Sequence, residues 1–225
     1  MRRGELAKLI DYALVKPTHT LADVERACRE VVELRIGALC VLPPFVRYAS
    51  AALAGRGRVC AVVSFPFGAD PTEVKVREAE HVVGEGADEI DFVINLPLFK
   101  SGRYEEVLRD IEAVTHAAKR AGERLGKEIV VKAIIETGYL TPEEVVTASR
   151  LVEEGGADFV KTCTGFGPRG ATLDDVRLIL SAVRRARVKA AGGISTYERA
   201  VEFVRAGASR IGTSHAVEIL SSAPH

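Results

Sequence analysis

One unit recurs along the chain, and its order constrains the fold more than any other feature. Each unit begins with a residue suited to cap a helix and a carboxylate three residues later, continues as an amphipathic helix, and ends with Gly-Ala before an apolar run. The cap pairs are Thr20 with Asp23, Asp70 with Glu73, Thr141 with Glu144, Thr172 with Asp175, and Ser195 with Glu198. The Gly-Ala pairs are Gly37-Ala38, Gly86-Ala87, Gly156-Ala157 and Gly207-Ala208. Helices and strands therefore alternate, which predicts βαβ units and a parallel sheet.

The apolar runs predict eight strands, near 10–14, 38–42, 59–65, 89–95, 129–136, 158–163, 187–191 and 209–212. The segments between them predict helices that include 21–35, 71–84, 102–124, 141–154, 172–185 and 196–206. Pro71 and Pro142 are expected at the first helical position, which favours proline. Eight such units in 225 residues fit a closed (β/α)8 barrel, the TIM barrel, as one domain over residues 1–225. An open doubly wound sheet is the alternative, but no G-x-G-x-x-G motif follows the first strand.

Composition excludes several classes of protein. The formal net charge is zero and no basic run occurs, so neither nucleic acid nor a membrane is an expected partner. The charged segment MRRGELAK lacks a signal-peptide core, and no apolar stretch approaches about 18 residues, so we expect a soluble cytoplasmic protein. The four cysteines and five histidines show no metal-ligand spacing, so no metal is predicted. One Asn, no Gln and one Met beside abundant Arg and Glu are typical of a thermophile, although a GC-rich genome favours the same bias.

Two lysines end consecutive apolar runs. Lys161 lies in FVKTCTGFGP and Lys189 in VKAAGG, and lysine is rarely buried without a partner. Neighbouring strands lie about 4.8 Å apart. Two ammonium groups about 4 Å apart repel by roughly 4 kcal/mol, or about 3 pKa units. One of the two is therefore expected to be neutral near pH 7 and nucleophilic towards a carbonyl.

Charged residues collect where the fourth to seventh strands are expected to end, at Asp91, Lys132 with Glu136, Lys161, and Lys189. In a barrel the working groups come from the C-terminal ends of strands, so these side chains are predicted to converge. An internal ion-pair network is the alternative, above all for Lys132. Glycines cluster at the last three strand ends: Gly165 and Gly167, Gly192 and Gly193, and Gly212 before Ser214. They predict a phosphate site in which backbone N–H groups bind the anion.

Six segments resemble the deoxyribose-phosphate aldolase family: IDYALVKP (10–17), CVLPPFV (40–46), ADEIDFVIN (87–95), VVKAIIETG (130–138), ADFVKTCTGFGP (157–168) and VKAAGGIST (188–196). The resemblance spans nearly the whole chain and implies a class I aldolase on a (β/α)8 barrel, without metal or cofactor. It implies an imine on Lys161, with Asp91 and Lys189 as the proton-transfer pair. The resemblance implies that Asp11 and Cys40 are pocket residues, and Lys132, Glu136 and Thr164 are further candidates for the supporting pocket. The implied phosphate-binding residues are Gly165, Gly192, Gly193, Gly212 and Ser214.

The implied reaction is the reversible cleavage of 2-deoxy-D-ribose 5-phosphate to D-glyceraldehyde 3-phosphate and acetaldehyde, by an enzyme expected to be a homo-oligomer. The chain departs from some family members at Phe166 and Ser195, where those members carry basic residues. Backbone amides would then hold most of the phosphate, with Arg169 as a candidate for a further contact. Two alternatives stay open: another phosphosugar enzyme with Glu136 as its base, and a phosphosugar-binding barrel whose lysines only hold an anion.

Overall fold

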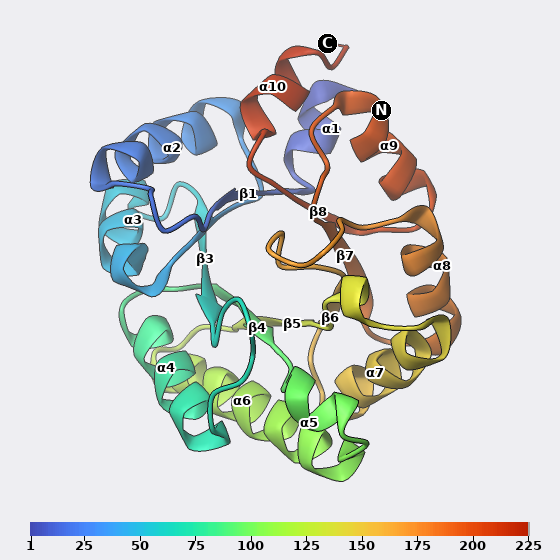
Figure 1. Cartoon of the computed structure of the whole chain (residues 1–225). Coiled ribbons are helices and arrows are strands. Elements are labelled where there is room, and N and C mark those ends of the chain that lie inside the picture. Colours follow the sequence, from blue (N-terminus) through green and yellow to red (C-terminus); the bar gives the residue numbers. More distant parts are fainter. Residues whose placement is uncertain (225) are drawn as a thin grey trace.

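Eight parallel strands close into a barrel, and helices surround it (Figure 1). The computed structural model describes residues 1–224. The strands are β1 (Ile10–Leu14), β2 (Ala38–Val41), β3 (Arg58–Val63), β4 (Glu89–Val93), β5 (Val130–Ile134), β6 (Phe159–Lys161), β7 (Arg187–Ala191) and β8 (Arg210–Thr213). Each strand pairs with the next, and β8 pairs with β1 through Ile211 and Ile10. The predicted TIM barrel is therefore confirmed, and the open sheet is excluded.

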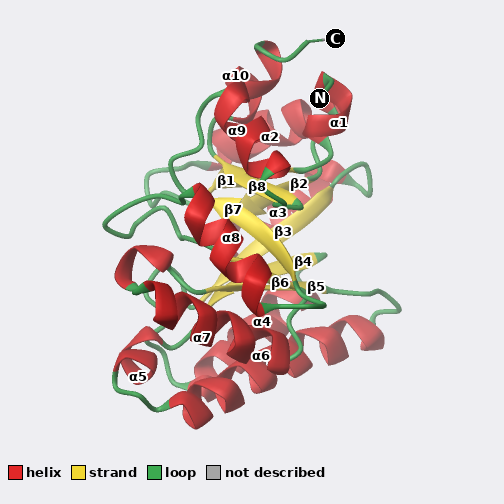
Figure 2. Cartoon of the chain, turned by 90° about the vertical axis from the view of Figure 1, so that its right-hand side faces the viewer, coloured by secondary structure: helices red, strands yellow, loops and turns green. Residues whose placement is uncertain are grey.

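The helices lie outside the strands, as the side view in Figure 2 shows. The α-helices are α1 (Arg3–Ala7), α2 (Leu21–Leu34), α3 (Val46–Leu53), α4 (Thr72–Gly84), α5 (Leu96–Lys100), α6 (Tyr104–Arg124), α7 (Pro142–Glu154), α8 (Leu173–Ala182), α9 (Tyr197–Arg205) and α10 (Ala216–Ser221). Two short 3-10 turns are η1 (Pro43–Phe45) and η2 (Thr137–Tyr139). The first and last helices lie together, and the backbone N–H of Arg3 donates to the carbonyl of Pro224 at 2.8 Å. Within residues 1–224, no helix has the length and apolarity that crossing a membrane requires.

Three of the five predicted helix caps form as expected. Thr20, Thr141 and Thr172 each accept a hydrogen bond from the backbone N–H three residues on, and the acidic side chain there accepts from the cap residue's own N–H. The prediction for Asp70 is wrong, because its carboxylate accepts a hydrogen bond from Ser64 instead. Ser195 is also not a cap, since Thr196 takes that position. The residue three positions after Thr196 is an arginine, so no capping box can form there.

Several predicted elements extend beyond the observed ones. The segment 102–124 begins as a helix only at Tyr104, because Gly102 adopts a left-handed φ of 71° after the separate helix α5. Likewise, α4 starts at Thr72, so Pro71 precedes the helix, whereas Pro142 is the first residue of α7 as predicted. Strand β5 stops at Ile134, two residues before Glu136, whose φ is 51°. Turns of this kind at the C-terminal ends of the strands form the rim at that end of the barrel.

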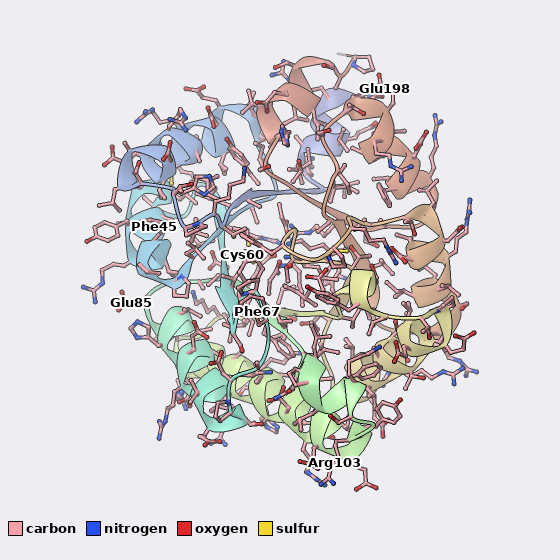
Figure 3. All side chains as sticks on the ribbon, in the orientation of Figure 1. Phe45, Cys60, Phe67, Glu85, Arg103 and Glu198 are labelled. Carbon is pink, nitrogen blue, oxygen red and sulfur yellow. The ribbon has the colours of Figure 1, made fainter. Side chains whose placement is uncertain are left out.

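The apolar core and the barrel interior have different chemistry. The large hydrophobic core lies between the strands and the surrounding helices, whereas the apolar cluster inside the barrel consists only of Ala38, Cys40, Cys60 and Val62. The interior also holds Phe159, which shares a face of β6 with Lys161, and seven buried charged side chains, which are Asp11, Glu89, Asp91, Lys132, Lys161, Lys189 and Arg210. Figure 3 shows Cys60 inside the ring of strands and Glu85, Arg103 and Glu198 at the periphery of the molecule. A charged barrel interior has to be explained by chemistry, because charge is costly to bury.

Candidate active site

Asp91 lies at the centre of the charged interior. It is fully buried on β4, and one of its carboxylate oxygens, Oδ2, is 2.6 Å from Nζ of Lys161 and 2.6 Å from Nζ of Lys189. Its other oxygen is 3.0 Å from Nζ of Lys132. The two lysines singled out from the sequence therefore meet at one carboxylate oxygen, and the expected convergence of Asp91 with all three lysines is confirmed.

Strand register explains why these side chains meet. Asp91 is paired with Lys132 across β4 and β5, and Lys161 with Lys189 across β6 and β7. Alternate residues of a strand face the same side of a sheet, so one inward position on each strand determines the others. Lys161 is the last residue of β6, which places its ammonium group at the mouth end of the barrel, while Lys132 reaches the same carboxylate from deeper in β5.

A second set of charged residues supports this centre from below. Asp11 on β1 forms ion pairs with Lys189 and Arg210, and Glu89 on β4 lies 2.6 Å from Arg210 and 2.5 Å from Lys132. Together with Asp91 and Lys161, these groups make four cations and three carboxylates. The internal ion-pair network considered as an alternative therefore exists, and Lys161 and Lys189 are the members of it that line the cavity above.

The network shifts the pKa values of its members. Burial by itself would raise the pKa of Asp11, but Lys189, Lys132 and Arg210 together hold it at about 2. Asp91 behaves in the same way: despite its burial, Lys132, Lys161 and Lys189 hold its pKa well below the ordinary value. Burial would lower the pKa of Lys189, but Asp11 and Asp91 raise it well above the ordinary value. Asp11 and Asp91 are therefore carboxylates near pH 7, and Lys189 is an ammonium ion.

Two sulfur atoms complete the interior. Cys60 Sγ lies 3.2 Å from Asp91 Oδ1, and Cys40 Sγ lies 4.0 Å from Asp91 Oδ2. These two thiols and Asp91 are the group in residues 1–224 whose ligand atoms lie close enough to hold a metal ion. Three lysines already occupy the oxygens of Asp91, and they would compete with a metal cation there.

A cavity of about 580 Å³ opens above the charged centre. Lys161, Lys189, Cys40 and Thr164 line its inner part. All five residues expected to bind phosphate also line it: Gly165, Gly192, Gly193, Gly212 and Ser214. Asp11, Asp91 and Lys132 are fully buried beneath it. The cavity therefore joins a lysine-rich floor to a glycine-rich wall, which suits a small molecule with a carbonyl at one end and an anion at the other.

Glu136 does not join the lysine cluster in the way its strand parity predicted. The left-handed turn at Glu136 takes it off the line of β5, and its carboxylate accepts hydrogen bonds from the backbone N–H (3.1 Å) and the hydroxyl of Thr164. Thr164 Oγ1 in turn accepts from the N–H of Phe166 at 3.0 Å. Glu136 thus supports the loop after β6 from behind, and it does not line the cavity.

Arg169 is likewise engaged away from the cavity. Its guanidinium forms two hydrogen bonds to Asp175, at 2.6 and 3.0 Å, and donates to the carbonyl oxygen of Thr137 at 3.0 Å. It is not among the residues that line the cavity. The suggested contact between Arg169 and a phosphate is therefore not supported by this geometry.

Four members of the site were not identified from the sequence as part of it: Lys16, Cys60, Glu89 and Arg210. A usable signal existed for Glu89, which stands two residues before Asp91 in EIDFV and so faces the same side. Arg210 likewise stands two residues before Gly212 in RIGT, so these two residues face the same side of their strand. Lys16 lines the cavity from the loop after β1, and its position in an irregular segment gave no periodicity to read.

Comparisons with known proteins agree with one another on a single family and a single fold. A family model described as "DeoC/LacD family aldolase" matches residues 4–219. The chain is 49% identical over 220 residues to the deoxyribose-phosphate aldolase of Carboxydothermus hydrogenoformans, covering 96% of this chain and 94% of that protein. It is 47% identical over 228 residues to that of Thermococcus kodakarensis, covering 100% and 99%. Among solved structures, the aldolase QR15 has a TM-score of 0.90 at 42% identity, covering 96% of this chain and 95% of that one. The tetrameric deoxyribose-phosphate aldolase of Aeropyrum pernix has a TM-score of 0.89 at 33% identity, covering 98% and 91%.

Proposed function

The chain belongs to the DeoC/LacD family of aldolases, and on this basis we propose that it is a deoxyribose-phosphate aldolase. It cleaves 2-deoxy-D-ribose 5-phosphate reversibly to D-glyceraldehyde 3-phosphate and acetaldehyde, through an imine on Lys161. The observation that carries the mechanism is the shared contact of Lys161 and Lys189 with one oxygen of Asp91, each at 2.6 Å, at the floor of the cavity.

Lys161 is the best candidate for the nucleophile among the three lysines. A lysine must be neutral when it attacks a carbonyl, and every adjacent carboxylate favours its charged form. Among residues 1–224, Lys132 contacts three carboxylates and Lys189 contacts two, whereas Lys161 contacts only that of Asp91. Lys132 is also fully buried below the cavity, while Lys161 lines it.

In the cleavage direction, the amine of Lys161 adds to C1 of the open-chain sugar, and loss of water leaves an iminium ion. The C2–C3 bond then breaks as its electron pair moves towards the iminium nitrogen, and the C3 hydroxyl loses its proton. Glyceraldehyde 3-phosphate departs, and an enamine remains on Lys161. Protonation of the enamine at C2 and hydrolysis of the resulting iminium release acetaldehyde and restore the lysine.

Asp91 and Lys189 fit two roles in these steps. The buried carboxylate of Asp91 lies next to the nitrogen that becomes positively charged, so it stabilises the iminium ion without any rearrangement. Lys189 lines the cavity as an ammonium ion, and with Asp91 it can hold a water molecule that carries protons to and from the substrate. Asp11 supports this arrangement indirectly, because it keeps Lys189 charged.

The alternative in which Glu136 acts as the base has less support. Oxygen Oε2 of its carboxylate accepts from Thr164, Oε1 is buried without a hydrogen-bond partner in the described chain, and the residue does not line the cavity, so it lacks a path to substrate. The alternative of simple anion binding leaves the burial of Asp11, Asp91 and Lys132 beneath the cavity without a purpose, because none of the three lines it.

Turnover assays test the proposed function directly. The purified protein should convert 2-deoxy-D-ribose 5-phosphate to equal amounts of glyceraldehyde 3-phosphate and acetaldehyde, and Lys161→Met should abolish the reaction while the protein remains folded, as circular dichroism would show. Absence of turnover by the unaltered protein would refute the proposed function. Full activity of Lys161→Met would refute the assigned nucleophile alone.

Two broader properties also belong to this proposal. Four free cysteines suit a reducing compartment, which supports a cytoplasmic location. A homo-oligomer is supported by the relative from Aeropyrum pernix, which is described as a tetramer. Light scattering of the purified protein distinguishes an oligomer from a 24.2 kDa monomer.

A further inference from the structure

Lys16 stands out among the cations of the cavity. Of the Lys and Arg side chains in residues 1–224, those that line the cavity are Lys16, Lys161 and Lys189. Lys161 and Lys189 are held at the floor by Asp91. The side chain of Lys16 is exposed, and it forms no ion pair with a carboxylate of the described chain. Its charge is therefore available to a bound ligand.

The barrel topology brings Lys16 to the glycine-rich side of the cavity. Strand β1 pairs with β8, with Asp11 opposite Gly212 and Tyr12 opposite Thr213. The loops that follow these two strands are therefore neighbours on the rim, and Lys16 shares the cavity wall with Gly212 and Ser214. Thr18, in the same loop as Lys16, lines the cavity too and adds a hydroxyl group.

The backbone around Lys16 is anchored at both ends. Its N–H donates to Nδ1 of His19 at 3.1 Å, and the capping box of Thr20 and Asp23 fixes the start of α2 just beyond. Strand β1 holds the other end up to Leu14. A long side chain on a fixed backbone can reach into the cavity without reordering the loop, so little conformational freedom of the backbone is lost on binding.

Apart from His215, which lines the cavity with its Nδ1 3.2 Å from the hydroxyl of Ser214, the other candidate sources of positive charge are absent or occupied. Phe166 and Ser195 line the cavity with neutral side chains, and Arg169 is bound to Asp175 outside it. A phosphate dianion held only by backbone N–H and hydroxyl groups would lack the stronger hydrogen bonds that a charged donor makes. We propose that Lys16 pairs with the phosphate group of the substrate and is the main determinant of the preference for a phosphorylated sugar. This inference rests on the proposed function, since it concerns the same cavity.

The test compares turnover of 2-deoxy-D-ribose 5-phosphate with that of 2-deoxy-D-ribose, in the unaltered protein and in Lys16→Met. The ratio of the two kcat/KM values should fall by about 10- to 100-fold in Lys16→Met, as expected for losing a hydrogen bond to a charged group. The loss should lie mainly in KM for the phosphorylated substrate. Lys16→Arg should retain most of the preference, and Lys8→Met, which removes an exposed lysine that does not line the cavity, should leave it unchanged.

Three outcomes would overturn the inference. The ratio could stay within about twofold in Lys16→Met, Lys16→Arg could lose the preference as fully as Lys16→Met, or Lys8→Met could reduce it equally. If the unaltered protein turned over neither sugar, the proposed function would fail. Titration with inorganic phosphate would then test whether Lys16 binds a phosphate group. Weaker binding of phosphate to Lys16→Met than to Lys8→Met would support its role, and equal binding would refute it.

Discussion

Replacing Lys189 with methionine should reveal how the buried charges depend on one another. Met has a similar length but no charge, so Lys189→Met leaves the space filled and removes the ammonium ion from between Asp11 and Asp91. Breaking a buried ion pair on one side typically costs about 3–5 kcal/mol. Both carboxylates retain other cations, which are Arg210, Lys132 and Lys161. We therefore expect a loss near the lower limit, about 3 kcal/mol at pH 7.

The cost should depend on pH in a defined direction. The pKa of Asp11 is depressed from 3.8 to about 2 in the folded chain, so its contribution to stability is present above pH 4 and is lost as the pH falls towards 2. That shift corresponds to about 2 kcal/mol at neutral pH. In Lys189→Met the pKa of Asp11 should return towards its ordinary value, and the contribution disappears. The difference in unfolding free energy between the two proteins should thus be constant from pH 7 to 5 and shrink by about 1 kcal/mol at pH 3.

Urea denaturation at pH 7, 5, 4 and 3 measures this difference, with Lys8→Met as the control for loss of an exposed charge. Steady-state assays on the same preparations should show turnover reduced by about 10²- to 10⁴-fold, the usual cost of removing a group that takes part in proton transfer. A stability difference that is below 1 kcal/mol at pH 7, or that is the same at pH 7 and pH 3, would refute the reasoning about Asp11 and Lys189.

Three other predictions address the loop after β6 and the whole chain. Glu136→Gln should lower kcat/KM by about tenfold in steady-state assays, because Thr164 loses a charged acceptor. Unchanged kinetics would show that the conformation of the loop after β6 does not depend on the charge of Glu136. Arg169→Met should reduce the unfolding free energy by about 1 kcal/mol without altering the preference for a phosphorylated sugar, whereas Phe166→Lys should enlarge that preference. If Arg169→Met instead lost the preference and Phe166→Lys left it unchanged, Arg169 would be the residue that contacts the phosphate. The melting temperature should exceed the mesophile range of about 45–65 °C, and a value inside that range would attribute the composition to genome bias.

The fold was predictable because its signals are local and repeated. The Thr caps, the Gly-Ala pairs and the apolar runs each act within about 15 residues, and the repetition of one unit specifies the barrel. Gly86 shows why such a signal is reliable: its φ of 113° and the Ser50 side chain close to it exclude other residues. Asp70 fails as a cap because it bonds to Ser64 in the preceding loop, and Ser195 fails because the helix begins one residue later; the cap pattern reveals neither.

The convergence of Lys132, Lys161 and Lys189 on Asp91 was also predictable, whereas the pairing of Glu89 with Arg210 was not. Lys161 and Lys189 stand out because lysine is unexpected in an apolar strand. Glu89 and Arg210 lie in equally apolar surroundings, but their pairing across the barrel depends on which strands close the ring. The turn at Glu136 could not be foreseen either, because strand alternation applies only while the strand continues.

Trapping the intermediate tests the central claim, an imine on Lys161, most directly. Sodium borohydride added with acetaldehyde reduces an imine to a secondary amine, which leaves an ethyl group on the reacting lysine. Peptide mass spectrometry should find this group on Lys161 alone, and it should be absent from Lys161→Met treated in the same way. An ethyl group on Lys189 or Lys132, or none on any lysine, would contradict the account.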